Sequence, residues 1–215
     1  MGNHSAAARY TFGEELANSL THGFGLLLSI AGLCGLMFVA SGVRETASCL
    51  VYGITLILVY ATSTLYHGAC RADAKQLLRT LDHVAIFLLI AGTYTPFVLI
   101  AMRGAWGWSL FVAVWTLAAV GAVFELTALR RMRGVMIALY IGMGWIGLVA
   151  IKPLVAALPT PGLWLLFGGG VSYTFGVLFY VWRGLRYHHA VWHLFVLGGS
   201  VLQYFAVLFY VLPKT

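Results

Sequence analysis

The sequence predicts an all-α polytopic membrane protein, a bundle of seven transmembrane helices. Of its 215 residues 61% are hydrophobic and only 9% are charged, and the mean hydropathy is +0.92. So few charges cannot solvate the surface of a soluble domain of this size. Apolar stretches of about 20 residues recur along nearly the whole chain, and each is long enough to cross a hydrocarbon core of about 30 Å.

Short charged connectors separate the apolar stretches. The first stretch follows Glu14 and Glu15, in a segment without the basic start and cleavage site of a signal peptide, so it is expected to remain as a helix. No connector is long enough for a soluble domain. Residues 1–215 are therefore expected to form a single seven-helix transmembrane domain, which begins with a cytoplasmic segment of residues 1–19. The expected spans are 20–41, 47–68, 79–101, 107–127, 134–152, 161–182 and 189–212.

The basic residues predict the orientation, because lysine and arginine in short loops collect on the cytoplasmic side. With a cytoplasmic N-terminus and an outer C-terminus, the inner segments hold nine of the 13 and the outer segments four. We expect a multi-pass protein of the cell (inner) membrane. Its formal charge of +7 is expected to come from basic residues that contact anionic lipid headgroups and not nucleic acid. The inner residues are Arg9, Arg71, Lys75, Arg79, Arg130, Arg131, Arg133, Arg183 and Arg186, and the outer ones are Arg44, Arg103, Lys152 and Lys214.

This topology places three histidines and an aspartate at one depth. His67 ends the second span, Asp82 lies about one turn into the third, and His189 and His193 occupy the first two turns of the seventh. Positions i and i+4 share a helix face, so His189 and His193 can bind one metal ion. His67 would add a third nitrogen, and three imidazoles with an open position are typical of catalytic zinc sites. Ser63, one turn from His67 on the same face, would point toward the centre.

These residues also have purely structural interpretations. A lone histidine near a helix end is more often an interfacial hydrogen bonder than a ligand. Asp82 could instead cap its helix or pair with Arg79. Cys70 lies one turn after His67 and could reach the same site or serve as a small packed residue. His83 and His188 are expected to face sideways or lie at the interface, and the site does not need them.

A further polar cluster precedes the first span. Glu15, Asn18 and His22 are spaced to share one helical face at the cytoplasmic boundary. They could form an ordinary polar helix entry, or a network that supports the metal ligands from the bundle interior. Glu125, near the inner end of the fourth span, could join this network or pair with Arg130.

The glycine-rich segments are interpreted as packing features. The run Gly142-Met-Gly144-Trp-Ile-Gly147 matches the dinucleotide-binding fingerprint, but no strand precedes it and no acidic residue follows at the required distance. Glycines in membrane helices let neighbouring backbones approach, and residues 168–170 are interpreted in the same way. Such faces suit pairing of two copies and packing within one bundle equally well, which leaves the oligomeric state open.

Four motifs occur in order on this seven-span frame, and together they are highly specific. On these motifs the chain resembles the haemolysin III branch of the progestin and adipoQ receptor (PAQR) family over essentially its whole length. The motifs are Glu15-x2-Asn18-x3-His22, Ser63-x3-His67, Leu81-Asp82 in the span that continues Ile90-Ala-Gly-Thr-Tyr-Thr-Pro96, and His189-x3-His193.

The resemblance implies a zinc ion held by His67, His189 and His193 in a bundle with a cytoplasmic N-terminus. It further implies that Asp82 holds or activates a water on the zinc, with Ser63 close by. The related receptors and the similar alkaline ceramidases imply hydrolysis of a lipid amide. The bacterial branch is linked to membrane-lipid homeostasis and, by its name, to haemolysis.

Three functions are compatible with these features. The leading hypothesis is zinc-dependent hydrolysis of an amide or ester in a membrane lipid, with Asp82 as general base and Ser63 at the developing oxyanion. The second is a membrane-state sensor or receptor in which zinc joins helices two and seven. The third is a haemolytic pore, which ranks last because the middles of most spans are apolar, with Gln203 among the exceptions.

Overall fold

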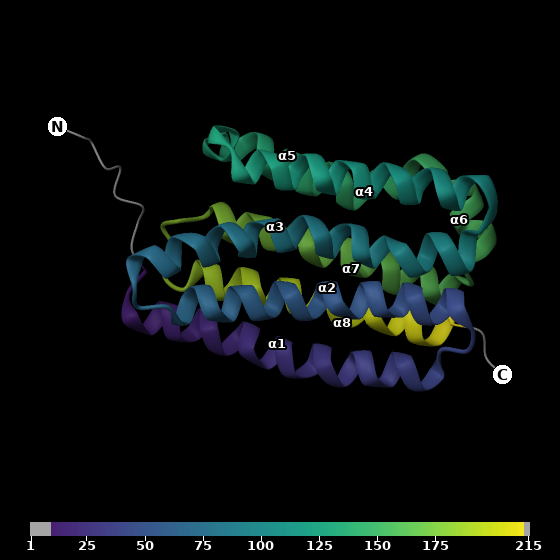
Figure 1. Cartoon of the computed structure of the whole chain (residues 1–215), viewed down its shortest axis with the longest axis horizontal. Coiled ribbons are helices and arrows are strands. Elements are labelled where there is room, and N and C mark those ends of the chain that lie inside the picture. The colour runs from purple at the N-terminus through teal and green to yellow at the C-terminus, as the bar shows by residue number, and fades with distance from the viewer. Residues whose placement is uncertain (1–9, 213–215) are drawn as a thin grey trace.

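The computed structural model describes residues 10–212, which are almost entirely helical and contain no strand. Seven helices are long and apolar enough to cross a membrane, as the sequence predicts, and they lie side by side along one direction (Figure 1). The elements are α1 (Phe12–Val39), α2 (Val43–Gly68), α3 (Ala72–Pro96) continued by η1 (Phe97–Met102), α4 (Gly104–Leu126), η2 (Ala128–Arg131), α5 (Arg133–Trp145), η3 (Ile146–Ala150), α6 (Ile151–Ala157), α7 (Thr160–Val181) and α8 (His188–Ala206) continued by η4 (Val207–Val211).

The helices enclose a common interior. Contacts run in succession from α1 to α2, α3, α5, α7, α8 and back to α1, while α4 packs against α3 and α5. Because the spans alternate in direction, α1, α3, α5 and α8 begin at the same end of the bundle, and α2, α4 and α7 finish there (Figure 1). We call this the histidine end, since His67 and His189 lie on it.

The first helix begins at Phe12 and not at residue 20. Thr11 starts it with a capping box: Glu14 N donates to Thr11 Oγ1 at 3.3 Å, and Thr11 N donates to Glu14 Oε2 at 2.8 Å. The two bonds satisfy backbone donors that the first turn leaves free. The polar motif from Glu15 to His22 is therefore helical, and residues 1–9 of the expected N-terminal segment lie outside the described residues.

The third helix also begins earlier than expected, at Ala72 and not at residue 79. Asp73 lies in its first turn, where a negative charge is favoured by the helix dipole. Asp82 is therefore nearly three turns from the helix start and not one turn, given about 3.6 residues per turn. Capping of this helix by Asp82 is excluded by that distance.

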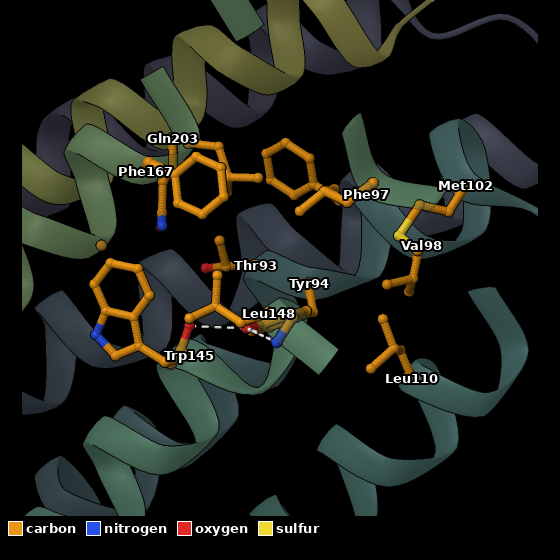
Figure 2. A pocket seen from close by; sticks show the side chains of 15 residues that line it. Thr93, Tyr94, Phe97, Val98, Met102, Leu110, Trp145, Leu148, Phe167 and Gln203 are labelled. Carbon is orange, nitrogen blue, oxygen red and sulfur yellow. Dashed lines mark hydrogen bonds between the residues drawn. The ribbon is translucent and has the colours of Figure 1, made fainter. Parts of the chain in front are cut away.

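The fifth span is interrupted after Trp145, where the α-helix gives way to a 3-10 segment. Tyr94 satisfies the backbone at this break, because its hydroxyl donates to Gly144 O at 2.8 Å and accepts from Gly147 N at 3.0 Å (Figure 2). A Cβ atom at Gly147 would press on Tyr94, whereas one at Gly142 would meet nothing within 4 Å. The packing interpretation of this glycine run is thus right for Gly147 and wrong for Gly142 and Gly144.

Candidate metal centre

The structure brings the three predicted histidines together at the histidine end. His67 comes from the last turn of α2, and His189 and His193 come from the first two turns of α8. Each offers a ring nitrogen, and these nitrogens all lie within 4.8 Å of one another. The side chains are buried, with exposed fractions of 3%, 9% and 1% respectively. Three imidazoles from two helices thus face one point inside the bundle.

Glu15 fixes the ring of His67. Glu15 Oε2 lies 2.7 Å from His67 Nδ1, and Asn18 Nδ2 lies 3.4 Å from the same nitrogen. Lys75 Nζ in turn lies 2.8 Å from Glu15 Oε1, so the carboxylate is held from both sides. With Nδ1 occupied, Nε2 is the nitrogen left for a metal ion, as in the carboxylate–histidine–metal arrangements of known sites.

His193 is held by the same stretch of α1. Its Nδ1 lies 3.2 Å from the carbonyl oxygen of Asn18 and 3.2 Å from the hydroxyl of Thr21. The ring of His22 stacks on that of His193, with centroids 3.5 Å apart and an angle of 12° between the planes. The structure therefore places the motif of Glu15, Asn18 and His22 directly behind the histidine group.

The donor set fits a metal ion. His67 Nε2 and His189 Nδ1 are buried and have no hydrogen-bond partner among residues 10–212, a costly state that a ligand bond would relieve. Three neutral imidazoles suit zinc, copper, iron or nickel. Zinc sites with three histidine ligands and an open position are typical of hydrolytic enzymes, and this group supplies three such nitrogens. Cys70 is exposed and does not belong to this group.

The histidine group opens into a cavity of about 170 Å³ in the bundle interior. His189, His193, Asp82 and Ser63 all line it, so the structure places the predicted aspartate and serine beside the histidines. Asp82 is 7% exposed and Ser63 is 1% exposed. The Ser63 hydroxyl lies next to Asp82 and has no hydrogen-bond partner within the described residues. A hydroxyl and a carboxyl group thus line the same cavity as two of the three histidines.

A second cavity of about 60 Å³ adjoins the first, deeper in the bundle (Figure 2). Its walls are mainly apolar, with Phe97, Phe167 and Leu148 among them. Both cavities are lined by Thr93, Tyr94, Gly144, Trp145, Gly170 and Gln203. An apolar extension therefore leads away from the histidine group toward the far end of the bundle.

Comparison with known proteins decides the family. The model of the family described as "Haemolysin-III related" matches residues 10–204. The chain belongs to the haemolysin III family. It is 48% identical to Hemolysin-3 of Bacillus cereus, covering 93% of each chain, and 44% identical to the Hemolysin-3 homolog of Bacillus subtilis (strain 168), covering 94% of this chain and 96% of the relative. The monocyte to macrophage differentiation factor of Homo sapiens is 29% identical, covering 95% of this chain and 89% of the relative, which supports the wider PAQR family.

Two of the structural alternatives fail in this haemolysin III protein. Among residues 10–212 no nitrogen of Arg79 comes within the 4.0 Å of Asp82 that an ion pair requires. Glu125 joins neither Arg130 nor the motif on α1, because its Oε1 lies 3.0 Å from Nδ1 of His83. His83 lines the same cavity as Asp82, which the sequence did not indicate. Its partner lies 42 positions away on α4, too far for any local spacing to reveal.

Tyr10 is another residue near the site that the sequence did not single out. It immediately precedes α1, and its ring centroid lies 5.2 Å from that of His189 and 6.0 Å from that of His67. Burial raises the pKa of its hydroxyl above the ordinary value, so the phenol is neutral at physiological pH. Tyr10 covers the histidine group of this haemolysin III protein at the histidine end.

Proposed function

We propose that this haemolysin III protein is a zinc-dependent hydrolase of an amide or ester bond in a membrane lipid, acting in membrane-lipid homeostasis. One observation carries the proposal: three buried histidines converge on a cavity that also holds a buried carboxyl, Asp82, and an unpartnered hydroxyl, Ser63. Buried polar groups without partners are rare, and their convergence in an apolar cavity is typical of catalytic sites.

His67, His189 and His193 would hold the zinc ion, and Glu15 and the Asn18 carbonyl would keep two of the rings oriented. Zinc on three imidazoles supplies Lewis acidity, which polarises a carbonyl group and lowers the pKa of a water to about 7. All three ligands are neutral, so the charge of the ion is not cancelled by the protein.

The remaining chemistry falls to Asp82 and Ser63. Asp82 takes a proton from the water while the water oxygen bonds to the substrate carbonyl carbon. The same carboxyl then gives the proton to the departing nitrogen or oxygen as the carbon–nitrogen or carbon–oxygen bond breaks. Ser63 donates a hydrogen bond to the carbonyl oxygen, where negative charge develops. The apolar walls keep other water away and so strengthen these interactions.

The proposal includes an orientation. Within residues 10–212, the basic residues that the sequence assigns to the cytoplasm belong to the loops and helix starts of the histidine end, with Arg71, Arg130 and Arg183 as examples. The positive-inside rule then puts the histidine end on the cytoplasmic side of the cell membrane. Water reaches the site from the cytoplasm, and the lipid bilayer around the seven helices supplies the substrate. We treat the seven helices as one transmembrane domain.

Metal analysis and lipid hydrolysis on the same purified samples test this function. The wild type should contain about one zinc per chain and release fatty acid from an N-acyl or O-acyl lipid. Asp82→Asn should keep the zinc and lose about 10²–10⁴-fold of the rate, which is the usual contribution of a general base. The double variant His189→Ala and His193→Ala should lose both the zinc and the lipid hydrolysis. Unchanged turnover in Asp82→Asn would refute this mechanism.

A structural zinc in a non-enzymatic sensor is the competing function. It is favoured by the way in which the ligands join two helices, since His67 belongs to α2 while His189 and His193 belong to α8. That function predicts zinc in the wild type and in Asp82→Asn, with no lipid hydrolysis by either protein. The hydrolysis assay on zinc-loaded wild type therefore separates the two.

A further inference from the structure

Three arginines line the mouth of the cavity that holds the histidine group. Arg79 comes from α3, Arg130 from η2 and Arg133 from the start of α5, so three separate elements each contribute an arginine to the lining of one cavity. Arg79 is half-buried, whereas Arg130 and Arg133 are exposed. Arg131 lies between the last two in the chain but does not line the cavity.

These three arginines form no salt bridge in the described part of the chain, although the Asp82 carboxyl lines the same cavity as Arg79. Within residues 10–212 no carboxylate oxygen lies within 4.0 Å of their nitrogens, and none of the recorded hydrogen bonds starts from their side chains. Of the carboxyl groups that line the cavity, Glu125 is bonded to His83 and Asp82 faces Ser63. A bound anion would offset the cost of removing the half-buried Arg79 guanidinium from water, and the exposed Arg130 and Arg133 add positive charge to the lining of the same cavity.

The start of α5 adds positive potential at the same place. The helix begins at Arg133, runs for 13 residues, and has no side-chain cap on its first N–H groups. Free N–H groups at a helix start attract anions, and phosphate most of all. Arginine is also the side chain best suited to phosphate, because its planar fork donates two parallel hydrogen bonds.

We propose that Arg79, Arg130 and Arg133 bind the phosphate of an anionic membrane phospholipid, which would make such lipids the substrate class of the site. The link to a substrate rests on the function proposed above, whereas the binding itself does not. Arg79 lies three positions before Asp82 on the same helix face, a rise of about 4.5 Å. The glycerol backbone joins the phosphate to the acyl esters of the same lipid, so a phosphate bound at Arg79 holds those esters at the cavity that Asp82, His189 and His193 line.

The size of the cavity agrees with this mode of binding. Its volume of about 170 Å³, with about 60 Å³ in the adjoining cavity, is below the ~300–1,000 Å³ of sites that enclose a whole small molecule. A lipid therefore places only its phosphate and the glycerol esters next to it in the cavity. Its chains remain in the surrounding bilayer, which requires a ligand that already resides in the membrane.

Lipid retention measured by native mass spectrometry tests the site on the full-length, metal-loaded protein. The protein is released from nanodiscs of phosphatidylcholine that contain phosphatidylglycerol or, in a separate sample, neutral diacylglycerol. The wild type should retain one phosphatidylglycerol in preference to the other lipids. Arg79→Gln, and separately the double variant Arg130→Gln and Arg133→Gln, should weaken retention by roughly tenfold, as expected for a lost charge-assisted hydrogen bond. Arg79→Lys, which keeps the charge, should retain more than Arg79→Gln.

Arg131→Gln and Arg186→Gln are the matched controls, since both remove a charge from the same end of the bundle outside the cavity. Equal losses in these controls would overturn the proposal, because they would show general attraction to a basic surface. Retention of diacylglycerol as strong as that of phosphatidylglycerol would also overturn the proposal. So would displacement of phosphatidylglycerol by millimolar inorganic phosphate, if that phosphate then occupies the site without a lipid. If Arg79→Gln fails to fold, lipid retention by the double variant Arg130→Gln and Arg133→Gln, whose residues are exposed, decides the test. Zinc content and hydrolysis are measured on each variant, so failure of catalysis is distinguished from failure of lipid binding.

Discussion

Glu15 Oε2 lies 2.7 Å from Nδ1 of His67, although the two residues are 52 positions apart. The contact joins the first turn of α1 to the last turn of α2. It fixes the tautomer and the angle of an imidazole whose other nitrogen is buried without a partner among residues 10–212. Glu15 is itself held by Lys75 of α3, so three helices determine the direction of one ring.

Replacement of Glu15 should therefore weaken metal binding without removing a ligand. We expect Glu15→Ala to reduce the affinity for zinc about 10- to 100-fold, the usual effect of losing such a supporting carboxylate. Glu15→Gln should lose less, because an amide oxygen still accepts a hydrogen bond from Nδ1. Competition with a chelator of known affinity measures the change. Glu45→Ala is the control, since among residues 10–212 Glu45 bonds only to Ser41, at the opposite end of the bundle. An equal loss of zinc affinity in this control would contradict the prediction.

Removal of the metal should lower the stability of the bundle. A ligand that binds only the folded state stabilises it by RT ln(1 + [L]/Kd), which is about 4.1 kcal/mol at a thousandfold excess over Kd. The three histidines join α2 to α8, so a chelator should lower the melting temperature of the detergent-solubilised wild type. The double variant His189→Ala and His193→Ala should melt at the same temperature with and without chelator. A chelator response of wild-type size in that variant would place the metal elsewhere.

The sequence predicts the depth of the histidine group along the bundle better than it predicts the residues that surround the group. Alternation of spans fixes which helix ends meet, so the shared level of His67, His189 and His193 follows from the order of apolar runs. Composition shows which part of a helix lies in the hydrocarbon core of the membrane. The helix itself extends beyond that part for as long as backbone hydrogen bonds and caps support it. For this reason α1 and α3 begin at Phe12 and Ala72, earlier than the apolar runs.

The rotation of each helix about its axis is much harder to predict. The contacts of His83 with Glu125 and of Tyr10 with His189 depend on which faces meet after packing. Several faces of an apolar helix look alike in sequence, so no spacing rule selects the partner. The α1 motif was an exception, because its polar residues mark only one face and that face meets the histidines.

Ser200 should matter for stability, because two tyrosines from different helices share its hydroxyl. Tyr60 donates to Ser200 Oγ at 2.8 Å, and the Tyr173 hydroxyl lies 2.7 Å from the same oxygen. Ser200→Ala leaves buried hydroxyl groups without a partner, which should reduce the free energy of unfolding by about 1–3 kcal/mol. Denaturation in detergent measures this. The double variant Tyr60→Phe and Ser200→Ala should recover part of the loss, and a single variant as stable as the wild type would contradict the role.

Gly107 and Gly142 should respond in opposite ways to the same substitution. A Cβ atom at Gly107 would collide with the backbone carbonyl oxygen of Val98, whereas one at Gly142 would meet nothing within 4 Å. A backbone oxygen cannot rotate aside as a side chain can, so Gly107→Ala must push the start of α4 away from η1. Overpacking of this kind typically costs about 1–3 kcal/mol.

Gly142→Ala is the matched control, because it adds the same methyl group inside a helix where space is open. It should leave the stability unchanged or raise it by up to about 1 kcal/mol, since alanine is the better helix former. Melting temperatures of the two variants in the same detergent provide the comparison. Equal destabilisation by both substitutions would show that loss of glycine as such is responsible, and the close approach of α4 to Val98 would then not explain why Gly107 is required.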